Sequence, residues 1–407
     1  MTWKCRVKAH VLRDYWLKGW DETIVGRWHY RDLAADENWR NGWISFDSVT
    51  WNPDDSLLYC GLNSLDGDLL YTFDPRTGGF ASLGTRAWTD DLDCKIHRTI
   101  LRDPRTGCIY FGTSLLHDAD MQERAAGGKL VRYDPRKRSF TVLGIPFPHL
   151  YLQSIAADFD RSLLYAFTYP AEFVVRHDME SGSNRTLGYV GNALMFSQPH
   201  NAVVDKYGRL WGTYAETRAW DEVMGAHPIR LFAYDPGRSE FRWFPTGLSR
   251  KADPAQLLPD PPKPEGIGFA AGETRHKEDY GFCDSMLYDG DRYIYAGTVA
   301  GVLCRIDIET CAVEKICHVI AAGRLPALAL SADGVLYGAG GMQGHTQLFR
   351  WDTRGKTMES LASLFDPELG QSPARVHEMA VDGHGTLYLA ENDNHYRSSY
   401  LWTVTPE

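Results

Sequence analysis

The sequence predicts an all-β protein, a seven-bladed β-propeller with four antiparallel strands in each blade. Three observations predict it: a strand pattern that recurs seven times, an aromatic content of 13%, and a last copy of the pattern that stops after its third strand. Aromatic residues are enriched in strands, and a strand pattern that repeats at intervals of roughly 40–85 residues is typical of a propeller. We expect residues 1–407 to form this one domain, in which packing between neighbouring blades supplies the core.

The second strand of each copy is the most regular element of the repeat. It is an apolar segment that contains aromatic residues and follows a turn with Asp and Gly. The seven copies are LLYCGL (57–62), CIYFGT (108–113), LLYAFT (163–168), RLWGTY (209–214), YIYAGT (293–298), VLYGAG (335–340) and TLYLAE (386–391). The third strands that follow end in YTFDP, VRYDP, VRHDM, FAYDP, CRIDI, FRWDT and YLWTV.

The last copy has no fourth strand after LWTVTPE, and a ring of blades must not leave this edge open. The stretch KCRVKAHVLR (4–13) is strand-like and precedes the first full copy. We therefore expect it to pair with the C-terminal blade as its outer strand, within a closing strand and loop over residues 1–40. The Pro-rich stretch 246–280 is expected to be a long loop between blades four and five.

Charge and composition argue against several classes of partner. The net charge is −10 and no block of Lys or Arg stands out, so nucleic acid is not expected as a partner. No apolar run is long enough to span a membrane. The first residues contain no apolar leader region, and the 8 cysteines form no paired CxxC framework. We expect a cytoplasmic protein with free thiols, or a secreted one if a leader has been removed.

The segment IHRTILRDPRTGCIYFGTSLLHDAD (96–120) places two histidines around one predicted hairpin. Residues 96–102 are predicted to form the inner strand, and the next strand returns beside it, so its end lies next to His97. His117 follows on the exit loop, at the same rim of the propeller. The same register applied to the next two blades adds Tyr169 and Tyr214 to this rim.

This part of the chain resembles the seven-bladed propeller polysaccharide lyases, which include the ulvan lyases and the related rhamnosyl-glucuronate lyases. The resemblance rests on IHRTILRD…GCIYFGTSLLHD, on LLYAFTYP and on NRTLG. In that family a His opens the inner strand, a second His follows the hairpin, and a Tyr and then an Arg come in the next blade. The matching residues here are His97, His117, Tyr169 and Arg185, and the resemblance implies that they are catalytic.

β-Elimination beside a uronic acid requires these residue types. The reaction removes the proton at C5 and expels the oxygen at C4, and the carboxylate must be neutralised so that an enolate-like state can form. Arg185 suits that role through a bidentate fork. His117 and Tyr169 suit the base and the acid, in either order, and His97 would help with the carboxylate or with positioning. The expected partner is a saccharide that contains a glucuronate-type unit.

Two other functions remain open on the same scaffold. A glycoside hydrolase, similar to the rhamnosidases, would use paired carboxylates, and Asp118, Asp120 and Glu216 lie on predicted exit loops. A non-catalytic carbohydrate-binding propeller would use Tyr214 and Trp220 as aromatic platforms for the sugar. Ultraviolet absorbance distinguishes these functions, because only elimination creates a conjugated unsaturated uronate.

A metal site is also predicted in the central channel. His200, Cys283 and His377 occupy equivalent starts of inner strands, and a His₂Cys set suits Zn²⁺ when a fourth ligand or a water completes it. The related lyases often carry a metal in the channel, usually thought structural. Asp284 is expected to point to the opposite face. The sequence contains no Gly-rich phosphate loop, GxSxG or HExxH motif, so no organic cofactor is expected.

Overall fold

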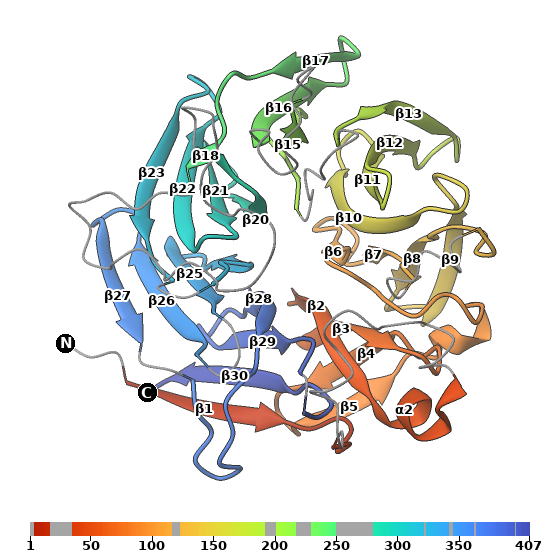
Figure 1. The fold of residues 1–407 in the computed structure, drawn as a ribbon, viewed down its shortest axis with the longest axis vertical. Coiled ribbons are helices and arrows are strands. Elements are labelled where there is room, and N and C mark those ends of the chain that lie inside the picture. Colours follow the sequence, from red (N-terminus) through yellow and green to blue (C-terminus); the bar gives the residue numbers. More distant parts are fainter. Residues whose placement is uncertain are drawn as a thin grey trace, which may run out of the picture.

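The computed structural model describes residues 4–16, 35–115, 123–191, 201–216, 229–249, 280–320, 323–341, 345–361, 364–394 and 396–407. Within them, seven four-stranded antiparallel sheets stand around a common axis, which confirms the predicted propeller (Figure 1). Helix is almost absent from these described residues, where α2 (Glu37–Gly42) has 6 residues. In this part of the chain no helix has both the length and the hydropathy needed to cross a bilayer.

Each blade is built from four strands that follow one another in the chain, from the axis outward, except for the seventh. Blades 1 to 3 are β2 (Ile44–Asn52), β3 (Leu57–Ser64), β4 (Leu70–Asp74), β5 (Gly79–Ser82); β6 (Leu101–Arg102), β7 (Ile109–Gly112), β8 (Leu130–Asp134), β9 (Ser139–Gly144); and β10 (Tyr151–Asp158), β11 (Leu163–Tyr169), β12 (Phe173–Asp178), β13 (Asn184–Tyr189). Blades 4 and 5 are β14 (Val203–Val204), β15 (Leu210–Ala215), β16 (Ile229–Asp235), β17 (Glu240–Trp243); and β20 (Cys283–Tyr288), β21 (Tyr293–Thr298), β22 (Val302–Asp307), β23 (Val313–His318). Blades 6 and 7 are β24 (Ala327–Leu330), β25 (Val335–Gly340), β26 (Gln347–Asp352), β27 (Thr357–Leu361); and β28 (Val376–Val381), β29 (Leu387–Glu391), β30 (Leu401–Pro406), β1 (Cys5–His10).

The N-terminal strand closes the ring, as predicted. β1 pairs antiparallel with β30, from Cys5 opposite Pro406 to His10 opposite Leu401, and the two strands lie side by side in Figure 1. Of the loop predicted over residues 246–280, the structure describes only the two ends, where β18 (Leu248–Ser249) pairs with β19 (Tyr280–Gly281). The pairing of β1 protects the edge of β30 that would otherwise be open.

Seven apolar clusters hold the blades together, and each joins two neighbouring blades around the ring. In the cluster between blades 4 and 5, for example, Trp211 packs with Cys283 and Ile294. No blade has a separate core of this size among the residues that the structure describes, so burial at each junction supplies the stabilisation, at about 25 cal/mol per Å² of apolar surface. This is the radial packing that the repeat predicts.

The Asp residues that end the third strands shape the turn into the fourth strand. Oδ1 of Asp134 accepts hydrogen bonds from the backbone N–H groups of Arg136 (3.0 Å) and Lys137 (3.2 Å). The same pair of bonds is made by Asp178, Asp235, Asp307 and Asp352, and Asp74 makes the first of them. An Asp at this position mimics a backbone turn, which explains why it recurs in the repeat.

A buried ion pair organises the blade that closes the ring. The carboxylate of Glu391, at the end of β29, lies 3.0 Å and 3.1 Å from two nitrogens of the Arg397 guanidinium. It also accepts bonds from the Trp402 indole (3.0 Å) and from the backbone N–H groups of Ala374 and Tyr400 (both 2.8 Å). Because both charges are fully buried, removal of one partner leaves the other uncompensated.

We expect Glu391→Gln to lower the free energy of unfolding by about 3–5 kcal/mol, because the Arg397 charge would stay buried without its partner. The control is Glu359→Gln, which removes a carboxylate 2.8 Å from Arg350 at a partly exposed site. That change should cost less than about 1 kcal/mol. Urea unfolding of the two variants measures both values. Similar losses would show that the buried Glu391 pair contributes no more to the free energy of unfolding than the partly exposed one.

Candidate functional site

Four inner strands share one irregularity close to their first residues. In β2, β10, β20 and β28 the pairing with the second strand shifts, so one residue of the inner strand is skipped. The residues at these β-bulges are Asp47, Gln153, Asp284 and His377. A bulge re-aims a side chain and often occurs next to active sites. The bulged positions therefore decide which side chains face the axis.

Blade 2 departs from the inner strand that we predicted over residues 96–102. Only β6 is paired there, and it is preceded by isolated bridges from Lys95 to Asn63 and Ser114. Arg98 has φ +28°, a backbone conformation that is uncommon for a residue with a Cβ. The predicted strand is thus wrong over its first half, because the chain bends there and sends the Arg98 side chain to the axis.

The guanidinium of Arg98 joins blade 2 to blades on the far side of the axis. Its Nε donates to Nε2 of His377 (3.1 Å), and its Nη1 donates to the backbone oxygens of Asp284 and Pro326. The Asp284 carboxylate lies 3.4 Å from Nη2 and also accepts two bonds from Arg324. Our expectation that Asp284 points away from the channel was wrong, because the bulge in β20 turns it inward.

His97 and His377 lie next to each other at the axis, with ring centroids 4.9 Å apart. Nδ1 of His97 donates to the Gln153 carbonyl (2.8 Å), and Nδ1 of His377 donates to the Asp47 carbonyl (2.7 Å). A carbonyl can only accept, so each ring carries a proton on Nδ1. Burial, and then the cationic Arg98, hold the pKa of His377 well below its usual value, so this ring stays neutral.

The structure turns Cys283 away from the predicted zinc set. Its side chain packs in the apolar cluster between blades 4 and 5, and its thiol donates to the Ser285 carbonyl (3.4 Å). Burial raises the pKa of this thiol, which disfavours the thiolate that binds metals. The prediction placed Cys283 one residue out of register, because the bulge presents Asp284 instead. His200 lies outside the described residues.

Asp47, His97 and His377 are the described side chains whose possible ligand atoms come together, all within 4.8 Å of one another. The protein's own cations already bind two of them, because Nζ of Lys95 lies 2.7 Å from Oδ2 of Asp47 and Arg98 donates to His377. A divalent cation would be repelled by both of these charges. The three side chains do not fit a metal as they are arranged.

Tyr169 ends β11 at the rim where the inner strands begin. Its ring lies against Tyr151, with centroids 5.2 Å apart, at the edge of a small apolar cluster that includes Leu115 and Ala125. Burial, and then the carboxylate of Glu172, raise the pKa of Tyr169, so its phenol keeps its proton at neutral pH. Glu172 is fully buried. Sequence reasoning missed it, although a Glu three residues after the candidate Tyr was a visible signal.

The structure brings His97 and Tyr169 to the same end of one inner strand. His97 bonds to the Gln153 carbonyl of β10, and Tyr169 pairs with Tyr151, two residues earlier in that strand. The two side chains differ in access, however. His97 is 4% exposed and packs at the axis, whereas Tyr169 is partly exposed at the rim. A ligand at the rim can therefore reach the phenol more directly than the imidazole.

Arg185 lies away from this end of blade 3. It is exposed on the outer strand β13, opposite Arg176, which in turn lies opposite Tyr165 of β11. Two strand spacings and four residues along β11 separate it from Tyr169, about 16 Å between Cα atoms. Arg185 lies far from Tyr169 because it is near the start of the fourth strand, and the fourth strand of a blade begins at the opposite rim. The resemblance placed Arg185 at the site, and its position in the structure contradicts that placement.

Tyr214 packs onto its own blade instead of presenting a free ring face. It lies edge-on to Trp243, with centroids 4.7 Å apart, and its hydroxyl donates to the Phe244 carbonyl (3.3 Å). The exposed ring at this place is Trp243, which is 46% exposed. The predicted residues His117 and Trp220 lie outside the part of the chain that the structure describes, so their roles remain predictions.

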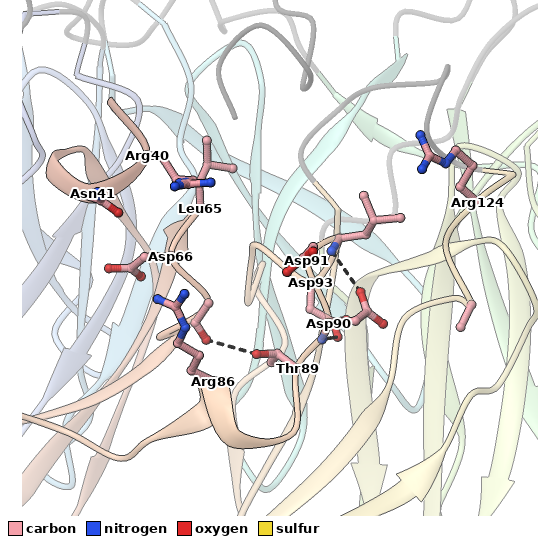
Figure 2. Close-up of a pocket in the computed structure, with 13 residues that line it drawn as sticks. Arg40, Asn41, Leu65, Asp66, Arg86, Thr89, Asp90, Asp91, Asp93 and Arg124 are labelled. Atoms are coloured by element: carbon pink, nitrogen blue, oxygen red, sulfur yellow. Dashed lines mark hydrogen bonds between the residues drawn. The ribbon is translucent and has the colours of Figure 1, made fainter. Parts of the chain in front are cut away.

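A pocket of about 740 Å³ lies on the same rim as Tyr169, between blades 1 and 2 (Figure 2). It is lined by the end of α2, the turn between β3 and β4, residues 86 and 89–93 before β6, and residues 124 and 126. Leu92 of its wall also packs on the cluster of Tyr151 and Tyr169. Sequence reasoning missed this pocket because its lining comes from loops that carry no recognisable motif.

Comparison with known proteins supports the fold. No protein-family model matches the chain, and no curated protein sequence matches it. A solved structure titled streptogramin B lyase is similar, with a TM-score of 0.60 and 11% identity, over 100% of both chains.

The extracellular domain of a putative hybrid two component system from B. thetaiotaomicron is also similar, with a TM-score of 0.56 and 14% identity over 89% of this chain. A second structure of that domain gives a TM-score of 0.55 and 13% identity over 89% of this chain. This chain spans 38% of the length of the protein chain in each of those two structures. Identities this low show that the fold is shared, and a fold hosts many activities.

Glu378 follows His377 in β28 and should make the stability of the protein depend on pH. Burial raises its pKa from 4.5 to about 8, although Arg98 acts in the opposite direction. Its Oε2 has no hydrogen-bond partner among the described residues. A carboxyl group with a raised folded pKa contributes stability below its unfolded pKa, and this contribution is lost as the pH rises through the folded pKa.

We expect the stability of Glu378→Gln to rise relative to the wild type between pH 4.5 and pH 8, the range that the pKa shift defines. The change should be a few kcal/mol over this range, measured by urea unfolding at several pH values. Glu314→Gln, at an ion pair with Arg305 in which the Glu314 side chain is 56% exposed, is the control and should show no such trend. A pH-independent difference for Glu378→Gln would mean that this carboxyl is ionised in the folded protein.

Proposed function

We propose that the protein is a lyase that cleaves a glycosidic bond beside a glucuronate-type uronic acid, in a polysaccharide or oligosaccharide, by β-elimination. The observation that carries the proposal is the position of Tyr169. A partly exposed phenol lies at the rim, next to the buried carboxylate of Glu172 and beside a pocket whose size suits a small-molecule ligand. This arrangement supplies a proton donor where a saccharide can reach it.

The raised pKa of Tyr169 favours one of the two roles that the sequence left open. In the elimination a base takes the C5 proton, a double bond forms between C4 and C5, the bond from C4 to oxygen breaks, and the leaving oxygen needs a proton. Because its pKa is raised by burial, the Tyr169 phenol is protonated at neutral pH and has a proton to donate to the leaving oxygen. We assign Tyr169 as the acid, which leaves the role of base to His117. The support for His117 comes from the sequence alone.

Another cation must neutralise the uronate carboxylate, since Arg185 lies on the outer strand. Arg124 is exposed, lines the pocket beside Tyr169, and directly precedes Ala125 of the cluster against which Tyr169 packs. A guanidinium there can bind a carboxylate through two parallel hydrogen bonds. His97, which is almost fully buried, is better suited to hold the start of β10 through Gln153 than to contact the sugar.

Specific observations keep the two other functions as second candidates. The exposed Trp243 would serve a carbohydrate-binding propeller without catalysis, and one similar structure is the extracellular domain of a putative hybrid two component system. The aspartates of the pocket would serve a hydrolase, although Lys129 already binds Asp90 and Asp93. A screen of uronate-containing saccharides with an ultraviolet readout decides among the three, because hydrolysis and binding create no conjugated double bond.

We expect Tyr169→Phe to reduce kcat for elimination by about 10²–10⁴-fold, because the variant keeps the ring but cannot protonate the leaving oxygen. His117→Ala should cause a loss of the same order. Initial rates of absorbance increase, on the saccharide that gives a signal with the wild type, measure both variants.

Tyr207→Phe is the matched control. Its hydroxyl lies in an exposed turn between β14 and β15, where it bonds to Glu309 at 2.8 Å, and its loss should leave the rate within about twofold, as surface changes usually do. A Tyr169→Phe variant with nearly normal turnover would remove the phenol from the mechanism. Products without ultraviolet absorbance would replace elimination with hydrolysis.

A further inference from the structure

The walls of the rim pocket carry two kinds of charge. Arg40 from α2 and Arg86 from the segment after β5 lie on the blade 1 side, as Figure 2 shows. Asp90, Asp91 and Asp93 lie on the opposite side of the pocket, ahead of β6. Asp66 lies on the side of the two arginines, and Arg124 lies on the side of the three aspartates. A cavity that presents both guanidinium groups and carboxylates can bind a ligand that has both an acid group and hydroxyl groups.

Most of the carboxylates in and behind the pocket are already bound by cations of the protein. Nζ of Lys129 lies 2.8 Å from the Asp90 carboxylate and also contacts that of Asp93. Arg13 binds the carboxylate of Asp66. The bond from Lys129 helps to lower the pKa of Asp90, against the effect of burial, so this carboxylate stays ionised and oriented. These ion pairs offset part of the negative charge of the acids and hold their oxygens in place as hydrogen-bond acceptors.

The two arginines on the other wall differ in this respect. Arg40 and Arg86 are exposed, and neither forms an ion pair with another residue of the described chain. An unpaired guanidinium in a concave site of about 740 Å³ is less screened than one on an open surface, and its charge is available to an anionic ligand. Leu65 and Leu92 add apolar surface to the same pocket, suited to the C–H face of a sugar ring.

We propose that this pocket binds an acidic sugar unit, with Arg40 and Arg86 receiving its carboxylate and the oxygens of Asp90 and Asp91 receiving its hydroxyl groups. The proposal rests on the proposed function only for the class of ligand. Leu92 separates the pocket from Tyr169, so a saccharide bound at both places would carry a second acidic unit besides the one that reacts. The substrate is then an oligomer or polymer with at least two acidic sugars.

Binding is tested without reference to turnover, by titration of the wild-type protein with free D-glucuronate and with D-glucose, followed by saturation-transfer NMR. The two sugars share a ring and differ at C6, where glucuronate carries the carboxylate. Glucuronate is expected to bind at least about tenfold more tightly than glucose, the contribution of one charge-assisted contact of roughly 1.4 kcal/mol. Equal binding of the two sugars would overturn the proposal.

The variant with both Arg40→Ala and Arg86→Ala should lose this preference for glucuronate. Arg136→Ala is the control, because Arg136 lies in the exposed turn between β8 and β9, remote from the pocket. An unchanged preference in the double variant would overturn the assignment of the two arginines. Inorganic sulfate provides a further arm: binding of sulfate as tight as that of glucuronate would show a site for any small anion and would overturn recognition of a sugar.

The two proposals can fail separately. Glucuronate binding that depends on Arg40 and Arg86, in a protein without elimination activity, would keep the pocket and reject the lyase. Elimination whose KM on an acidic saccharide is the same in the double variant and in the wild type would keep the lyase and reject the pocket. The expected result is a KM about tenfold higher in the double variant with kcat unchanged, since the pocket binds a unit that does not react.

Discussion

Crowding at the propeller axis is the constraint on which the rest of the structure depends. Seven inner strands converge there, and polar side chains at their first residues have little contact with water, so they must satisfy one another. Arg98 does this most completely, because its guanidinium reaches from blade 2 to Asp284, Pro326 and His377 on three other blades. A buried charge without such partners would cost several kcal/mol, so the bulges and the bend at Arg98 are parts of one solution.

This solution has a consequence for where a ligand can bind. Among the described side chains at the axis, Lys95 binds Asp47 and Arg324 binds Asp284. The two imidazoles donate to backbone carbonyls. A ligand that entered here would have to replace bonds that are already made in a region of low dielectric. The rim carries no such restriction, since Tyr169 is partly exposed there and the pocket opens beside it. The axis therefore supports the site, and the loops at the rim provide it.

The same constraint explains which features could be predicted from the sequence. All seven second strands, the turn Asp residues and the closure by β1 follow from local patterns, since alternation, turn chemistry and an unpaired edge are visible in the chain. The directions in which the Cys283 and Asp284 side chains point could not be predicted, because a one-residue bulge reverses them. The bulge itself depends on contacts with residues of other blades. The positive φ of Arg98 has the same origin. Arg185 was assigned to the site by resemblance to a family. That resemblance matched the spacing of residues along the chain and gave no information about the rim at which the strand of Arg185 begins.

Electrostatics links the rim to the acidic character of the whole protein. A net charge of −10 repels a polyanionic saccharide at long range, and at physiological ionic strength this repulsion is screened beyond about 8 Å. Attraction must then come from guanidinium groups that the fold leaves without carboxylate partners at short range. Arg40 and Arg86 meet this requirement, because Arg13 and Lys129 are the cations that bind Asp66, Asp90 and Asp93. The acidic surface would therefore reject anions in general, and the pocket would accept one only where a sugar ring also fits between its walls.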